Sequence, residues 1–151
     1  ISNCAREPQG GYRDQVMAVS AGVCDIAVIN TYYLGGMLKS SNESQQEAAM
    51  KVDVFWPNQV GRGAHVNISG AGITKASQSP ENAKKLLEFL TSPNSQRWYA
   101  EINNEYPVDP KVEASQILKN WGDFKSDSLP VDTLGKLNRE AVKSMDKAGW
   151  P

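Results

Sequence analysis

A nearly continuous apolar run of strand length, residues 24–29 (CDIAVI), constrains the fold of this chain more than any other segment. Such runs are typical of a parallel strand that is buried on both faces of a sheet. A shorter strand is expected at residues 1–5. Between the two strands, residues 14–21 have helical apolar spacing, and Gly22 follows at the position of a helix C-cap. Strand, helix and strand in this order form a βαβ unit, which predicts an α/β fold.

The remaining sequence alternates extended and helical segments in the same way. Residues that favour extended chain are concentrated at 52–56 and 60–74. Helices are expected at 45–51 and after the cap residues at 31, 79, 92 and 132. This alternation again indicates α/β architecture.

The composition excludes several classes of function. With 151 residues, of which 16 are basic and 17 acidic, the chain has a net charge of −1 and no electrostatic case for binding nucleic acid or an anionic membrane. No apolar stretch approaches the roughly 20 residues that a membrane-spanning helix needs. The sequence contains no P-loop, no dinucleotide-binding glycine motif after a strand, and one histidine. We therefore do not expect an enzyme.

The first residues carry no initiator methionine and no basic and apolar regions of a signal peptide. Residues 1–4 (ISNC) have the composition of a strand interior, so the sequence begins within an expected strand. We therefore expect a piece of a larger protein rather than a processed precursor.

The two cysteines, Cys4 and Cys24, do not form a zinc motif, because His65 is the only histidine and structural zinc needs four ligands. One interpretation is a disulfide, which would contribute about 3 kcal/mol in an oxidising compartment. The other is a pair of buried free thiols. The register of the two expected strands could place the sulfurs out of bonding range, so both interpretations stay open.

Four residues follow the strand expected at 24–29, namely Asn30, Thr31, Tyr32 and Tyr33. Ligands of α/β sheets bind beyond the carboxyl ends of the parallel strands, so the search for a site begins here. A phenol is neutral at pH 7, but a hard cation displaces its proton. A tyrosine pair therefore suits Fe(III) better than Zn(II) or Cu(I). The alternative is an amphipathic rim, with packed rings and hydrated hydroxyls, in which Asn30 is only a cap.

Residues 22–33 (GVCDIAVINTYY) resemble the iron-binding signature of the periplasmic ferric-iron-binding proteins of ABC importers, in their FutA/IdiA-like branch. Further segments are similar in the same order, at residues 8–15, 55–70, 104–107, 124–127 and 148–150. The resemblance covers essentially the whole chain. It implies a periplasmic-binding-protein type II fold, of which this chain is the C-terminal half with parts of both lobes.

The resemblance also implies the residues of a site. Tyr32 and Tyr33 correspond to the consecutive tyrosine ligands of Fe(III), which this family can bind together with a synergistic anion. Asn30, Thr31 and Arg62 are candidates to support the ligands or the anion.

The same resemblance implies a division of the chain and a set of partners. Residues 1–62 would belong to the C-terminal lobe, residues 63–113 to the N-terminal lobe, and residues 114–151 would return to the C-terminal lobe. The protein would act in the periplasm and hand iron to an ABC permease of the inner membrane. The missing N-terminal half would be its other partner. A chain that folds alone is expected to be a homo-oligomer, because its sheet edges and apolar faces are uncovered.

Two departures from the family pattern bear on this site. Gly36 occupies a position where the family often carries Arg or Lys, which changes the charge balance near the ligands. The family's other ligands lie in the first half of the protein and are absent here. A solute-binding protein for another small ligand, such as an anion or a thiamine-like molecule, is therefore an alternative. Another is a fragment with no independent binding.

Overall fold

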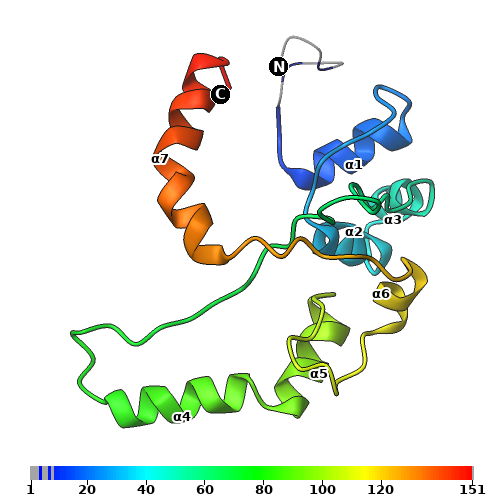
Figure 1. The fold of residues 1–151 in the computed structure, drawn as a ribbon. Helices are drawn as coiled ribbons and strands as arrows, with labels where there is room; N and C mark the ends of the chain where they lie inside the picture. The colour runs from blue at the N-terminus through cyan, green and yellow to red at the C-terminus, as the bar shows by residue number, and fades with distance from the viewer. Residues whose placement is uncertain (1–3, 5–6, 8, 151) are drawn as a thin grey trace.

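The computed structural model describes residues 4, 7 and 9–150. The helices of that part are α1 (Tyr12–Ser20), α2 (Thr31–Leu38), α3 (Glu43–Met50), α4 (Pro80–Leu90), α5 (Pro93–Ile102), α6 (Gln116–Asn120) and α7 (Val131–Lys147). In Figure 1, α1, α2 and α3 form one group, α4 and α5 lie below it, and α7 stands apart. No helix among these residues is both long enough and apolar enough to cross a membrane.

The expected helices are present with small shifts in their bounds. Helices α4 and α5 begin at Pro80 and Pro93, where the Ser-Pro pairs predict them. The Ser92 hydroxyl accepts a hydrogen bond from the Ser95 backbone, as an N-cap should. The final helix begins at Val131, with Pro130 rather than Asp132 as its N-cap. The short helix α6 was not expected from the sequence.

The expected strands do not pair into a sheet within the described residues. Residues 24–29 and 52–56 form neither helix nor paired strand, and the pairing recorded in this part is a parallel bridge between Ala64 and Ser126. Ile26 and Val28 are 77% and 92% exposed. A parallel strand is stabilised only by neighbouring strands, and the described residues place none beside these runs. The strand expected at residues 1–5 lies, apart from Cys4, outside the described residues.

A small apolar core joins the first three helices. Its buried side chains are Val16 of α1, Leu34 and Met37 of α2, and Ala48 and Ala49 of α3. Burying a side chain such as Leu34 or Met37 contributes about 1.5–3 kcal/mol each. This core fixes α2 against α1 and α3, so it determines where the first turn of α2 lies.

Two distant segments meet at what we call the crossing, residues 59–64 and 125–127. The Ala64 N–H donates to the Lys125 carbonyl at 2.8 Å, and the Asp127 N–H donates to the Ala64 carbonyl at 2.7 Å. The Gln59 side chain exchanges two further hydrogen bonds with the Lys125 backbone. Gly63 has a φ of +99°, and a Cβ on it would lie 2.6 Å from the Lys125 carbonyl oxygen. Only glycine fits this close approach of two backbones.

An aromatic cluster lies beside the crossing. The Trp56 and Phe124 rings stack with their centroids 4.0 Å apart, and Tyr106 meets both rings edge-on. The Trp56 indole N–H donates to the Trp121 carbonyl at 2.9 Å. The Tyr106 hydroxyl donates to the Leu118 carbonyl. These contacts attach α6 and the segment that follows it to residue 56.

The Tyr106 phenol makes the stability of this region depend on alkaline pH. Burial raises its pKa to about 12, and the nearby Asp123 carboxylate adds to this. Between pH 10 and about pH 12 the folded chain therefore keeps a proton that the unfolded chain has lost, and stability falls as the pH rises. We expect the urea midpoint of unfolding to drop across this range, and to drop less in Tyr106→Phe. Equal drops in both proteins would contradict this assignment.

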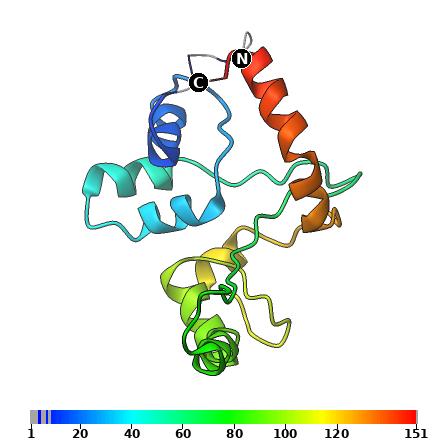
Figure 2. The same cartoon turned by 90° about the vertical axis from the view of Figure 1, so that its left-hand side faces the viewer.

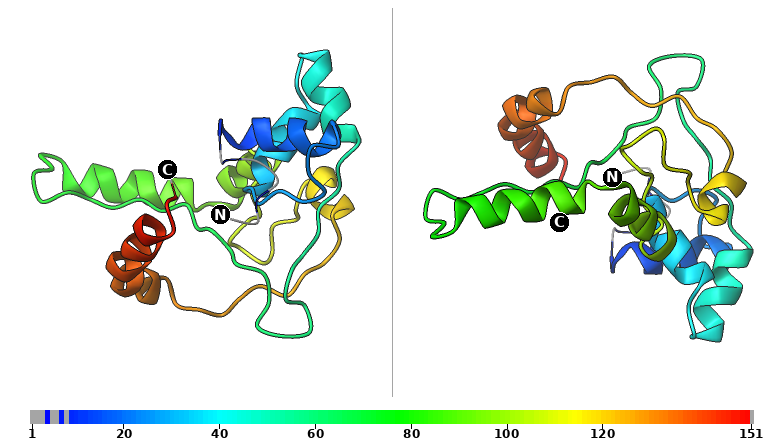
Figure 3. Two further views of the ribbon diagram at one scale, coloured as in Figure 1. Left: turned by 90° about the horizontal axis from the view of Figure 1, so that it is seen from above. Right: turned by 90° about the horizontal axis from the view of Figure 1, so that it is seen from below.

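The helices farthest from the core leave apolar side chains uncovered. Neither α4 nor α7 contains a buried residue. The exposed apolar side chains of these two helices are Leu86, Phe89, Val131, Leu134, Leu137, Val142 and Met145. Figure 3 shows α4 projecting from the rest of the chain, and Figures 2 and 3 show α7 lying apart from the group formed by α1, α2 and α3.

Candidate metal centre

The first turn of α2 carries the two tyrosines that the sequence singles out. Asn30 is the N-cap residue with extended backbone, at φ −79° and ψ 132°, and its carbonyl accepts a hydrogen bond from the Tyr33 N–H at 3.1 Å. Thr31, Tyr32 and Tyr33 are half-buried. The backbone turn from extended chain to helix places both tyrosine rings on one side, with their centroids 4.4 Å apart.

A third tyrosine joins the pair. Tyr12, the first residue of α1, stacks on Tyr33 with the ring centroids 4.5 Å apart and an angle of 24° between the planes. We call Tyr12, Tyr33 and Tyr32 the tyrosine stack. Helices α1 and α2 begin close to each other, so the stack lies at the N-terminal ends of two helices (Figure 1). Helix N-termini favour negative charge, which suits phenolates.

Tyr12 was not among the candidates from the sequence, although the order of the expected strands and helix pointed to it. In a βαβ unit, the start of the helix and the residues after the second strand lie at the same edge of the sheet. Tyr12 opens the first helix, and Tyr32 and Tyr33 follow the second expected strand. That shared edge would have predicted their proximity.

The Tyr32 phenol is electrostatically linked to its neighbours. Its pKa is raised, first by a hydrogen bond with Tyr33, then by burial and by the charge of Tyr33. A hydrogen bond with the Asn30 side chain acts in the opposite direction, and the charge of Tyr12 raises the pKa further. The Asn30 side chain makes no helix-capping hydrogen bond.

A tight contact behind α2 fixes the position of the helix. Gly35 is buried, and a Cβ on it would lie 2.6 Å from the Asn104 side chain. Asn104 is 1% exposed and has a positive φ of 56°. Its Oδ1 atom has no hydrogen-bond partner among the described residues. Asn104 lies in the segment that follows α5, and its close packing on Gly35 fixes α2 against that segment.

Arg62, the remaining candidate from the sequence, is not part of the tyrosine stack. The Arg62 Nε atom is 3.5 Å from an Asp127 carboxylate oxygen, so its guanidinium is engaged at the crossing. The groups that shift the Tyr32 pKa do not include it. The single histidine, His65, is exposed.

The candidate disulfide between Cys4 and Cys24 is not formed in the structure, which holds both cysteines as free thiols. The alternative of two buried thiols is not met either, because Cys4 is exposed and Cys24 half-buried. Disulfide geometry depends on how the two backbones are held together, and within the described residues no strand pairing fixes the segment that carries Cys24.

Among the described residues, no three His, Cys, Asp or Glu side chains gather in a way that could hold a metal ion. A metal at the tyrosine stack would therefore be bound through phenol oxygens. Such oxygens are hard, anionic donors once they lose their protons, which suits Fe(III).

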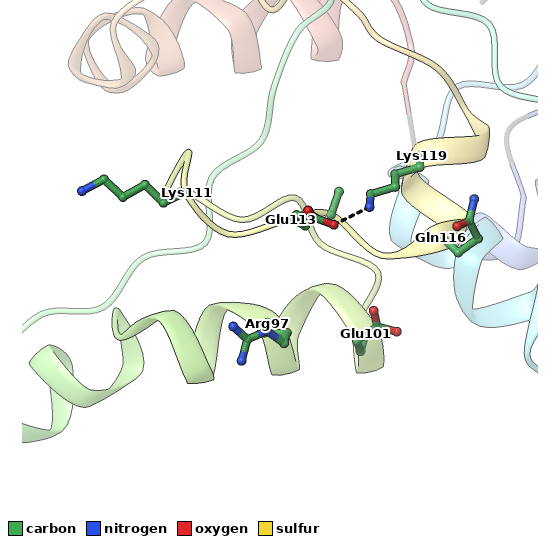
Figure 4. Close-up of a pocket in the computed structure, with 7 residues that line it drawn as sticks. Arg97, Glu101, Lys111, Glu113, Gln116 and Lys119 are labelled. Atoms are coloured by element: carbon green, nitrogen blue, oxygen red, sulfur yellow. Dashed lines mark hydrogen bonds and ion pairs between the residues drawn. The ribbon is translucent and has the colours of Figure 1, made fainter.

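An open polar pocket of about 520 Å³ lies between α5 and α6, lined by Arg97, Glu101, Lys111, Glu113, Ala114, Gln116 and Lys119. Lys119 forms an ion pair with Glu113, with the nitrogen and oxygen 2.7 Å apart. In Figure 4, Lys111 and Arg97 extend away from that pair. The cationic groups of this pocket do not point to a common ligand.

Comparison with known proteins relates the chain to a family and to individual relatives. A family model described as bacterial extracellular solute-binding protein matches residues 14–126. Iron uptake protein A1 of Synechocystis is 45% identical over 150 residues, which are 99% of this chain and 42% of that protein. The major ferric iron-binding protein of Neisseria meningitidis serogroup B is 27% identical over 134 residues, 89% of this chain and 39% of that protein. The chain thus spans less than half the length of these relatives.

Solved structures match over the same extent. The structure of Trichodesmium IdiA (FutA) in complex with iron and citrate ligands has a TM-score of 0.93 at 48% identity, over 99% of this chain and 47% of that chain. The ferric binding protein from Campylobacter jejuni has a TM-score of 0.94 at 42% identity, over the same shares. These matches confirm the predicted fold class, the α/β fold of type II periplasmic binding proteins, in a partial and helix-rich form. Since the family model matches most of its residues, the chain belongs to the bacterial extracellular solute-binding proteins.

Proposed function

We propose that this chain carries part of a ferric-iron site and serves in the periplasmic capture of iron for an ABC importer. The observation that carries the proposal is the Tyr32–Tyr33 pair, with ring centroids 4.4 Å apart at the start of α2 and Asn30 beside it. Adjacent phenols are a donor set that hard trivalent iron selects. Relatives whose names state iron uptake or ferric-iron binding support the same cargo.

Two phenolates do not fill the coordination sphere of Fe(III), so further oxygen donors must complete it. Citrate is a suitable source, because the Trichodesmium relative was solved with iron and citrate ligands. Asn30 would steady the Tyr32 oxygen through its amide N–H, and Thr31 lies beside it. The role is binding and hand-over, without catalysis.

The proposed division into residues 1–62, 63–113 and 114–151 is supported by the crossing. The bridge between Ala64 and Ser126 lies close to the first boundary and joins the third segment to the second. The first segment contains the tyrosine stack. The partners of this role are a permease and the remainder of a longer binding protein. Self-association through the exposed faces of α4 and α7 is the alternative when the chain is alone.

The direct test is a titration of the purified chain with ferric citrate. Phenolate-to-Fe(III) charge transfer should give a new visible band that saturates at one iron per chain. Zinc citrate should give no band and should not compete, because Zn(II) prefers nitrogen and sulfur ligands. If ferric citrate gives no visible band, and gel filtration separates all the iron from the protein, the proposed function is wrong for this chain.

A further inference from the structure

We propose that the phenol oxygen of Tyr12 is a third ligand to the ferric ion that Tyr32 and Tyr33 hold. This inference rests on the proposed function. It extends that function to a residue on a different helix.

The placement of the Tyr12 ring is the first argument. Its ring stacks on the Tyr33 ring with the centroids 4.5 Å apart and 24° between the planes, so the two rings are nearly parallel. Tyr33 in turn lies 4.4 Å from Tyr32. The ring of Tyr33 is therefore in contact with both of the other phenol rings.

The surroundings of Tyr12 are the second argument. Its side chain is 42% exposed and is not part of the apolar core of α1, α2 and α3. An exposed ring can reorient by rotation about its side-chain bonds without disturbing the core.

The chemistry of the donor is the third argument. A phenolate oxygen is a hard, anionic donor of the kind that Fe(III) prefers. On binding, the Tyr12 phenol would release its proton to solvent, and its oxygen would replace one citrate or water oxygen on the metal. No electron is transferred in this exchange. The N-terminal ends of α1 and α2 then face three anionic oxygens, an arrangement that the helix dipoles favour.

Two substitutions separate a ligand from a packing residue. Tyr12→Phe keeps the ring on Tyr33 and removes only the oxygen, whereas Tyr12→Ala removes both. For a ligand, both variants should lose about one third of the charge-transfer absorbance per bound iron and bind ferric citrate about 10-fold more weakly. For a packing residue, Tyr12→Phe should match the unchanged chain and only Tyr12→Ala should weaken binding. Tyr99→Phe, at a tyrosine that packs on Trp98, is the control and should change nothing.

The outcomes distinguish this inference from the function on which it rests. A full-strength band with unchanged affinity in Tyr12→Phe overturns the Tyr12 assignment and leaves the proposed function intact. If the unchanged chain gives no band, the function itself is wrong and the Tyr12 assignment is rejected with it. Equal helical circular dichroism in all the proteins confirms that the variants fold.

Discussion

The double variant Tyr32→Phe, Tyr33→Phe is expected to lose at least about two thirds of the visible band with ferric citrate. The rings remain, so the stack with Tyr12 is kept while both phenol oxygens at the start of α2 disappear. Loss of a group that only supports a metal ligand typically costs 10–100-fold in affinity, so removing two ligands should weaken iron binding more than about 100-fold. Absorbance titration and the iron content after gel filtration measure both effects.

A matched control for this variant exists within the chain. Tyr99→Phe with Tyr106→Phe removes the same number of phenol oxygens from positions that pack on Trp98 and Trp56 instead of the stack. This control should keep the band and the affinity of the unchanged chain. If the two double variants bind iron equally well, the site lies elsewhere.

Gly63→Ala is expected to have the largest effect on stability. A Cβ at this position would lie 2.6 Å from backbone atoms of Lys125 and Ser126, and the φ of +99° is strained for any L side chain. The crossing must open to accept the methyl group. We expect a loss of at least about 2 kcal/mol in urea unfolding, together with faster amide hydrogen exchange at Ala64 and Asp127.

Gly61→Ala is the control for this prediction. It tests whether the loss of stability comes from the close backbone approach at Gly63 or from replacing a glycine anywhere in this loop. A Cβ on Gly61 would find its nearest contact at 3.7 Å, the ordinary distance of atoms in contact. This variant should therefore lie within about 0.5 kcal/mol of the unchanged chain. A similar loss of stability in both variants would contradict the role given to Gly63.

The sequence predicted the elements whose signals are local. The Ser-Pro pairs at 79–80 and 92–93 mark the starts of α4 and α5, because a proline fits the first helical position. Helix α6 was missed because its five residues are too few to show apolar periodicity. The runs at 24–29 and 52–56 have strand-like composition, but pairing depends on neighbouring strands, which no local pattern supplies.

Only part of the candidate site could be predicted from the sequence. Tyr32 and Tyr33 were found because their position after an apolar run and their chemistry point to the same place. Tyr12 was missed because its contact with Tyr33 depends on how α1 packs against α2. Arg62 was a candidate from its position in the resemblance, whereas its ion pair with Asp127 depends on the crossing, which joins residues far apart in the sequence.

The uncovered apolar side chains of α4, α7 and residues 24–29 have a calorimetric consequence. The heat-capacity increment of unfolding comes mainly from apolar surface that is newly exposed to water, and it is ordinarily about 12–15 cal/mol/K per residue. Ile26, Val28 and Phe89 are already 77%, 92% and 63% exposed in the folded chain, so they add little to that increment. The stability curve of this chain is therefore flatter with temperature than that of a fully packed domain of the same length, so cooling or warming away from the temperature of maximum stability weakens it less steeply.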